Sequence, residues 1–575
     1  MKNTVKTICS ALVGAAAVAG VSSCGGNQNQ TESPMKQKVE EYAPFELTSP
    51  LAAQLSDNER QIVEIFFQIG QIADDLFWQQ TFGDKSLIDQ IADPYARQFA
   101  YINYGPWDRL DDNKPFIDGY GAKPDVCTYY PEDITLDEFN AFDDPDKSSW
   151  YTVLRRDENG KLKTVWYHEE YAEEVAEMCA LMQKAADLAE DPGLKNYLLK
   201  RIESFRTDDY LPSDLAWMDM KDSRIDFVIG PIESYDDKFQ ETKTSYESFI
   251  LLKDTERSKD LAKFVAMLPA LQKELPCKPE YKTFVPGTSS DLNVYDVVYY
   301  AGDCNAGSKT IAINLPNDER VHAMKGTRRL QLRNSMQAKF DKILLPIGEL
   351  ILAPEEHEHL KFDAFFWNVT FHEVAHGLGI KETINGKGSV DAAMGTEKTS
   401  WEEAKADILG LFMVCRLIEN GEITGITVED AITTYIAGIF RSVRFGAASS
   451  HGKANMMCFN FMEQQGAFTR NADGLYVIDY AKAGSIDMVT DDAEGRDFLF
   501  PSNQTALELY KQVHGDPVKS EIILNTPIVL YTRSAVAQAL VDSGLAVVTN
   551  GVYTVDMEKL TETIEAGTTW EEIGL

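Results

Sequence analysis

Three residues near the middle of the chain, His372, Glu373 and His376, have the types and the spacing of a metal-dependent hydrolase centre. Residues four apart lie on the same face of an α-helix, so the two imidazoles can point at one metal ion. Glu373 lies one residue further round the helix, where its carboxylate can reach a water molecule without ligating the metal. The pattern predicts a zinc site with a carboxylate that acts as general base.

The residues around this motif favour a buried helix. An apolar run at 365–369 precedes it, and Gly377 and Gly379 are expected to end the helix. The alternative interpretation is a helix that carries two ordinary histidines. The chain has only eight histidines, and buried imidazoles need polar partners, so we favour the metal site.

A catalytic zinc takes three protein ligands, and Glu403 is our candidate for the third. It follows His376 by 27 residues, which leaves room for a loop and a second helix that returns beside the first. His357 and His359 are rival ligands. They lie in a charged stretch that we expect to be solvated, and we therefore rank them below Glu403.

The start of the helix that carries Glu403 has two possible registers. Thr399 can cap the helix with Glu402, which leaves Glu403 free to bind metal. Ser400 can instead pair with Glu403, which would make that glutamate a cap. Asp407 lies four residues after Glu403 on the same face, where it can accept the outer N–H of a ligand imidazole.

The motifs at 372–377 and 402–407 resemble those of the dipeptidyl peptidase III family, peptidase family M49. The usual first motif has six residues, His-Glu-x-x-Gly-His. This chain has the five-residue form of a bacterial branch and of plant members that are fused to a Nudix domain, but it has no Nudix box. The resemblance implies that Glu403 is the third ligand of one Zn²⁺ per chain. It also implies that Asp407 accepts a hydrogen bond from the outer N–H of a ligand histidine and so orients its ring.

Three further segments extend the resemblance and imply roles for four residues. His451 matches a histidine that stabilises the transition state, although by itself it is an ordinary residue near a helix start. Asn314 and Asn317 match asparagines that hold the amino terminus of the peptide, although alone they mark a strand and a Pro-Asn turn. Asp226 matches an acidic residue that receives the ammonium group of the substrate.

One position departs from the family pattern. The catalytic tyrosine of the family, two residues after Asp226, falls on Val228. Either another tyrosine such as Tyr235 supplies the hydroxyl, or stabilisation of the oxyanion rests on His451 and the metal.

The first 24 residues have the pattern of a bacterial lipoprotein signal. Lys2 and Lys6 precede an apolar core at 8–21, and small residues lead to Cys24. By this resemblance Cys24 becomes the lipidated N-terminus, and residues 25–45 form a flexible tether. The expected location is the bacterial cell envelope, on the periplasmic or surface side of the outer membrane. The alternative is a plain secretory signal with an incidental cysteine.

Charge and length restrict the class of protein. A net charge of −36 and a pI of about 4.6 argue against a nucleic-acid partner, because phosphate binding needs a basic surface. An acidic cleft would instead favour a ligand with a cationic end, such as a peptide amino terminus. The 575 residues suffice for two or more lobes with large cores.

We expect a mainly helical α+β fold of two lobes with a central cleft. Strand-like runs at 225–232, 248–252, 294–300 and 310–315 predict a small sheet or barrel in one lobe. The expected division is a mixed lobe at 46–250 and 290–340, a helical zinc lobe at 251–289 and 341–525, and a C-terminal segment at 526–575.

The function predicted from these features is a zinc-dependent exopeptidase that releases dipeptides from the N-terminus of oligopeptides. The alternatives are another His-Glu-x-x-His amino- or endopeptidase, or a catalytically weak lipoprotein that binds peptides or metal. We expect a monomer that contacts the membrane only through its lipid.

Overall fold

The structure, a computed structural model, describes residues 33–483 except 45, 276–278, 284–290, 308, 384–385, 387, 389, 391–397 and 444–449, together with the strands 546–549 and 552–555. The predicted signal segment with Cys24 lies outside the described residues, as does most of the C-terminal segment 526–575. No helix of the described part combines the length and the apolarity that crossing a membrane requires.

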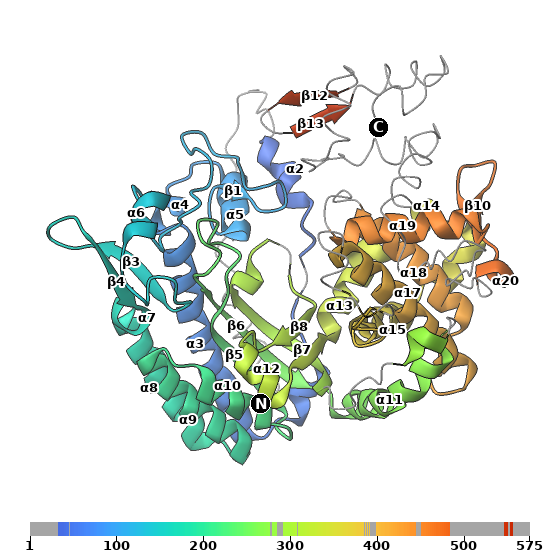
Figure 1. Ribbon diagram of the computed structural model, residues 1–575, viewed down its shortest axis with the longest axis horizontal. Helices are drawn as coiled ribbons and strands as arrows, with labels where there is room; N and C mark the ends of the chain where they lie inside the picture. The colour runs from blue at the N-terminus through green and yellow to red at the C-terminus, as the bar shows by residue number, and fades with distance from the viewer. Residues whose placement is uncertain are drawn as a thin grey trace, which may run out of the picture.

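A five-stranded mixed sheet lies at the centre of the molecule (Figure 1). Its strand order is β5-β6-β7-β9-β8, in which β7 and β9 are parallel and the other neighbours are antiparallel. The strands are β5 (Ile225–Glu233), β6 (Ser245–Lys253), β7 (Asp291–Gly302), β8 (Ala312–Leu315) and β9 (Arg328–Leu332). β5 and β8 are therefore the edge strands.

Helix α3 (Asp57–Thr81) covers one face of this sheet. It begins at a capping box in which Ser56 and Glu59 satisfy each other's backbone N–H groups. Phe66 of α3 stacks on Phe227 of β5 with ring centroids 3.9 Å apart. Burying an aromatic side chain of this size stabilises the fold by about 1.5–3 kcal/mol, so this contact helps to fix α3 on the sheet.

Further elements surround α3 and the sheet. α8 (Ala172–Leu188), α9 (Pro192–Thr207) and α10 (Leu211–Asp219) lie on the side away from α15 and α17 in Figure 1. The smaller elements are α2 (Pro34–Glu40), η1 (Pro50–Gln54), α4 (Ser86–Asp89), α5 (Pro94–Asn103), β1 (Trp107–Asp108), β2 (Lys114–Pro115), α6 (Leu136–Ala141), β3 (Thr152–Arg156), β4 (Leu162–Trp166) and α7 (Tyr167–Glu170).

A second hydrophobic core lies among helices on the other side of the sheet. Its main helices are α11 (Thr255–Glu274), α13 (Arg333–Lys339), α14 (Leu345–Ile351), α15 (Phe362–Ala375), α17 (Lys398–Glu419), α18 (Val428–Val443) and α19 (Ser450–Gln464). The remaining elements are η2 (Pro279–Lys282), η3 (Asp303–Asn305), α12 (Glu319–Lys325), η4 (Phe340–Leu344), η5 (Pro354–His359), β10 (Phe468–Arg470), β11 (Tyr476–Ile478), α20 (Tyr480–Ala483), β12 (Ala546–Thr549) and β13 (Val552–Val555).

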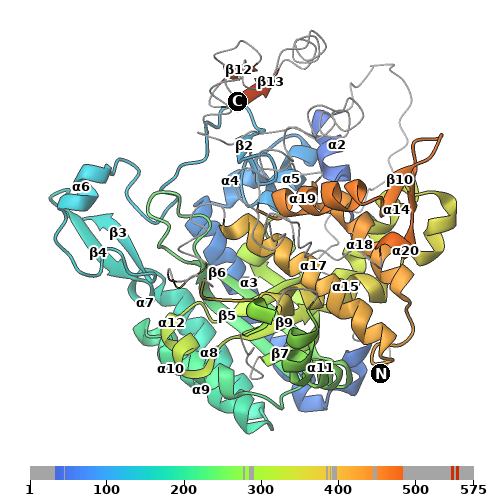
Figure 2. The same cartoon turned by 45° about the vertical axis from the view of Figure 1, so that its right-hand side comes forward.

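Strand β7 joins the two cores. Leu292 and Val294 belong to the helical core, whereas Tyr295 and Val297 belong to the core around α3. The architecture confirms the predicted fold class, a mainly helical α+β protein with one small curled sheet. α15 lies next to this sheet, since Arg329 of β9 donates a hydrogen bond to the backbone of Glu373 on α15 (Figure 2).

Candidate metal centre

Helix α15 carries the His-Glu-x-x-His motif and ends where the glycines predicted. Phe366 and Phe371 of this helix are fully buried in the helical core and fix its orientation. The helix ends at Ala375, with His376 as its C-terminal cap residue. Gly379 follows with a φ of +81°, a conformation that glycine adopts without strain.

The ring of His372 lies between two carboxylates of α17. Its Nδ1 is 2.7 Å from Asp407 Oδ1, and its Nε2 is 3.2 Å from Glu403 Oε2. Burial alone would lower the pKa of His372, but Asp407 and Glu403 raise it to about 10. Two carboxylates on one imidazole create a strongly negative site, which favours a cation there.

His376 has a matching arrangement with a different carboxylate. Its Nδ1 is 3.0 Å from Glu402 Oε1, and its Nε2 points toward Glu403 Oε2 at 3.9 Å. Glu402 is also 2.7 Å from Lys405 Nζ. Burial would raise the pKa of Glu402, but His376 and Lys405 lower it to about 2, so this carboxylate stays charged.

The sequence analysis missed this role of Glu402 because it assigned Glu402 or Glu403 to a cap. α17 already includes Thr399 and Ser400, so neither of them is the residue that precedes the helix. Both glutamates are therefore free to face the histidines. The adjacency of Glu402 and Glu403 in the sequence could have indicated this arrangement. Two neighbouring glutamates on one helix can each contact one of the two histidines of the motif.

Glu403 Oε2 is the atom on which these imidazoles converge. It is buried, and it accepts no hydrogen bond of normal geometry within the part of the chain that is described. Burial would raise the pKa of Glu403, but His372 and His451 hold it well below its usual value. Two imidazoles and a carboxylate are the typical donor set of catalytic zinc. An unsatisfied carboxylate oxygen among imidazoles therefore fits a bound divalent cation.

His451, at the start of α19, also reaches this centre. Its Nδ1 lies 3.0 Å from Glu403 Oε2, and candidate ligand atoms of His372, Glu403 and His451 all lie within 4.8 Å of one another. The side chain of His451 is 63% exposed. Asn455 of the same helix donates to Asp407 Oδ2 at 3.2 Å, which ties α19 to the carboxylate behind His372.

Close packing between α15 and α17 sets the distances in this centre. A Cβ atom on Gly410 of α17 would lie 2.8 Å from the backbone N of His372 and 3.0 Å from its Cα. The absence of a side chain at Gly410 therefore lets the two helices approach closely at His372.

The rival ligands lie in other contacts. His357 Nε2 is 3.1 Å from the carbonyl oxygen of Leu352, and His359 Nδ1 is 2.8 Å from Asp430 Oδ1. Both interactions are within the helical part, on η5 and α18. Neither rival belongs to the cluster around Glu403.

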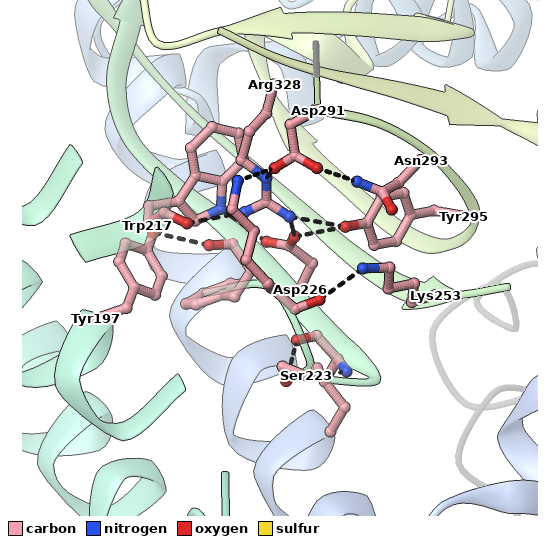
Figure 3. Close-up of polar contacts among 12 residues, drawn as sticks. Tyr197, Trp217, Ser223, Asp226, Lys253, Asp291, Asn293, Tyr295 and Arg328 are labelled. Atoms are coloured by element: carbon pink, nitrogen blue, oxygen red, sulfur yellow. Dashed lines mark hydrogen bonds and ion pairs between the residues drawn. The ribbon is translucent and has the colours of Figure 1, made fainter. Parts of the chain in front are cut away.

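The structure places Asp226 in the core of the sheet, which differs from the prediction that it binds the substrate ammonium group. Only 1% of Asp226 is exposed, and Figure 3 shows its carboxylate among three partners. Arg328 Nη2 lies 2.8 Å from Oδ2, Trp217 Nε1 donates to Oδ1 at 2.8 Å, and the Tyr295 hydroxyl donates to Oδ2 at 3.1 Å. This buried ion pair gives Asp226 a structural role.

The other predicted substrate residues, Asn314 and Asn317, lie on or just after the edge strand β8. Asn314 on β8 is exposed, and Asn317 just beyond β8 is exposed and donates to the carbonyl oxygen of Ile232 at 3.2 Å. Val228 lines a small pocket together with Asn317, and several aromatic side chains, among them Trp217 and Tyr210, form part of its wall. Tyr235, the candidate replacement for the family tyrosine, is 67% exposed.

Comparisons with known proteins point to one family. Residues 141–394 match the sequence profile of peptidase family M49. Nudix hydrolase 3 of Arabidopsis thaliana is 30% identical over 526 residues, which cover 80% of this chain and 68% of that protein.

Two solved structures have the same fold over most of the chain. The structure of DPP III from Caldithrix abyssi has a TM-score of 0.78 at 34% identity, covering 86% of this chain and 97% of that one. Dipeptidyl-peptidase III from Corallococcus sp. strain EGB has a TM-score of 0.65 at 31% identity, covering 85% and 98%. This chain therefore belongs to peptidase family M49 and is a metallopeptidase with the dipeptidyl peptidase III fold.

Proposed function

We propose that this protein is a zinc-dependent exopeptidase that releases dipeptides from the N-terminus of oligopeptides. One observation carries the proposal. His372 and His376 each bind a carboxylate through Nδ1 and turn Nε2 toward the unsatisfied Oε2 of Glu403. Such carboxylate–histidine pairs orient imidazoles for a metal and fix their tautomers.

We assign the two nitrogen ligands to His372 and His376 and the oxygen ligand to Glu403. Glu402 holds the ring of His376 in a fixed direction, whereas the side chain of His451 is 63% exposed and contacts Glu403 from the solvent side. This assignment leaves His451 available for the substrate. One Zn²⁺ per chain is the expected stoichiometry, because the donor set is that of a catalytic zinc site.

A bound zinc ion supplies Lewis acidity, which polarises the scissile carbonyl and makes water a better nucleophile. Glu373 takes the proton from the attacking water and delivers it to the leaving amine. It can do so because it follows His372 on α15 while its side chain stays outside the ligand set. His451 donates a hydrogen bond to the oxygen on which negative charge develops.

The amino terminus of the substrate is held by the asparagines at the end of the sheet. Asn314 and Asn317 are exposed and only three residues apart. The side-chain oxygen of each can accept a hydrogen bond from an ammonium group. The acidic net charge of the chain attracts that group over longer distances. Asp226 contributes indirectly, because its ion pair with Arg328 helps to hold the sheet.

A panel of dipeptidyl-naphthylamides tests the function directly. We expect the protein to release intact dipeptides, to lose this activity with a chelator and to regain it with added zinc. N-terminally blocked copies of the same substrates are the matched control and should be cleaved at least about tenfold more slowly, since the ammonium contacts are lost. Equal cleavage of blocked and free substrates would contradict an exopeptidase.

We also propose that the protein is a monomeric lipoprotein of the bacterial cell envelope, anchored through Cys24. The support is the basic, apolar and small-residue pattern that ends at this cysteine. We expect Cys24→Ser to move the protein from the membrane fraction to the soluble fraction of cells. An unchanged membrane fraction would contradict the lipid anchor.

A further inference from the structure

Arg329 on strand β9 connects the sheet to the catalytic helix. Its Nη1 donates a hydrogen bond of 2.8 Å to the backbone carbonyl oxygen of Glu373 on α15. The side chain is half-buried, so part of it is shielded from solvent. Figure 2 shows β9 next to α15, in agreement with this contact.

The carbonyl of Glu373 can accept a hydrogen bond from Arg329 because it lies in the last turn of α15, which ends at Ala375. In a continuing α-helix the N–H of Gly377 would donate to the Glu373 carbonyl, but here it donates to the carbonyl of Val374 at 3.0 Å. The N–H of Leu378 donates to the carbonyl of Ala375 at 2.9 Å. Carbonyls in the last turn of a helix carry partial negative charge, which a guanidinium group stabilises. Arg329 therefore satisfies a carbonyl in the last turn of the helix, one residue after His372.

On the sheet, Arg329 lies opposite a predicted substrate residue. The antiparallel register of β8 and β9 pairs Asn314 with Arg329, and the adjacent pair is Ile313 with Leu330. Ile313 and Leu330 are buried, so Asn314 and Arg329 face the opposite side of the sheet. The strand expected to hold the substrate amino terminus is thus linked to the helix of Glu373 through one arginine.

We propose that Arg329 is a positioning residue that fixes the distance between the amino-terminal binding strand and the catalytic helix, and so sets the cut after the second residue. This inference rests on the proposed dipeptidyl peptidase function. An extended peptide advances only about 3.3–3.6 Å per residue. A change of that size between β8 and α15 would bring a different peptide bond to Glu373.

Arg329→Met tests this proposal, because methionine keeps much of the side-chain volume and removes the donor. We expect kcat to fall about tenfold or more, while KM changes by less than about threefold, since the asparagines still bind the substrate. We also expect a larger share of single residues or tripeptides among the products of an oligopeptide, measured by mass spectrometry. Arg329→Lys keeps charge and a donor and should restore part of kcat and the dipeptide share.

Arg333→Met is the matched control. Arg333 also extends toward α15, where it lies 4.0 Å from Asp363 in the first turn of that helix and stacks on Phe362. Its loss should leave product length and kcat unchanged. The proposal is overturned if Arg329→Met keeps the wild-type kcat and product lengths, or if both methionine variants lose activity equally. Failure of the wild type to release dipeptides would instead reject the proposed function itself.

Discussion

Replacing Glu373 by glutamine should lower kcat for dipeptide release by about 10³-fold, a loss in the range typical of removing a general base. Glutamine has nearly the same shape as glutamate but cannot take a proton from water. The contact with Arg329 uses the backbone carbonyl of Glu373, so the substitution leaves it intact. Initial rates on a dipeptidyl-naphthylamide measure the effect.

Two measurements separate this loss of chemistry from a loss of structure. Zinc content and Tm should match those of the wild type, because the proposed ligands are His372, His376 and Glu403 and the substitution changes none of them. Glu358→Gln, an exposed glutamate before α15, is the control for removing one negative charge and should keep full activity. A Glu373→Gln enzyme that retains a tenth or more of the wild-type kcat would exclude Glu373 as the general base.

The sequence predicted the fold class and the local arrangement of the metal centre, because both depend on short-range periodicity. Four-residue spacing on a helix fixes which side His372 and His376 share, without knowledge of the remainder of the fold. The same argument brought Glu403 and Asp407 to one face of α17, and the structure brings all four together.

The partners of individual residues were less predictable, because they depend on elements far apart in the chain. Alternation along β5 gives the face on which Asp226 lies, but not what packs against that face. Its ion-pair partner Arg328 is 102 residues away, and Trp217 approaches from a helix. The resemblance to family M49 gave Asp226 a substrate role, whereas these contacts bury its charge.

The pairing of His376 with Glu402 shows the same limit at shorter range. A Thr-x-x-Glu pattern is typical of a helix start, and the sequence therefore predicted that Glu402 caps the helix together with Thr399. In the structure Thr399 and Ser400 already lie within α17, and the carboxylate of Glu402 contacts His376 instead. A local capping pattern therefore does not decide the partner of a glutamate when a buried imidazole on a neighbouring helix needs one.

Replacing Gly410 by alanine should disrupt the metal centre by pushing α15 and α17 apart where they touch. The added Cβ would meet the backbone of His372 at 2.8 Å and that of Phe371 at 3.0 Å. Backbone atoms cannot rotate away, so α15 and α17 must separate. A displacement of about 1 Å in an active site can lower activity about 10²-fold. We expect a loss of that order in kcat/KM together with weaker zinc retention against a chelator.

The matched control is Gly438→Ala on α18, where the nearest atom to the new Cβ is a side-chain carbon of Leu344 at 3.9 Å. There the substitution should be neutral or stabilising, since alanine favours a helix over glycine by about 0.5–1 kcal/mol. Alanine at Gly410 would have the same helix preference, but overpacking against α15 would cost about 1–3 kcal/mol and outweigh it. Urea unfolding of both variants gives the sign of each change. Normal zinc affinity and activity in Gly410→Ala would mean that close approach at His372 is not what sets the ligand geometry.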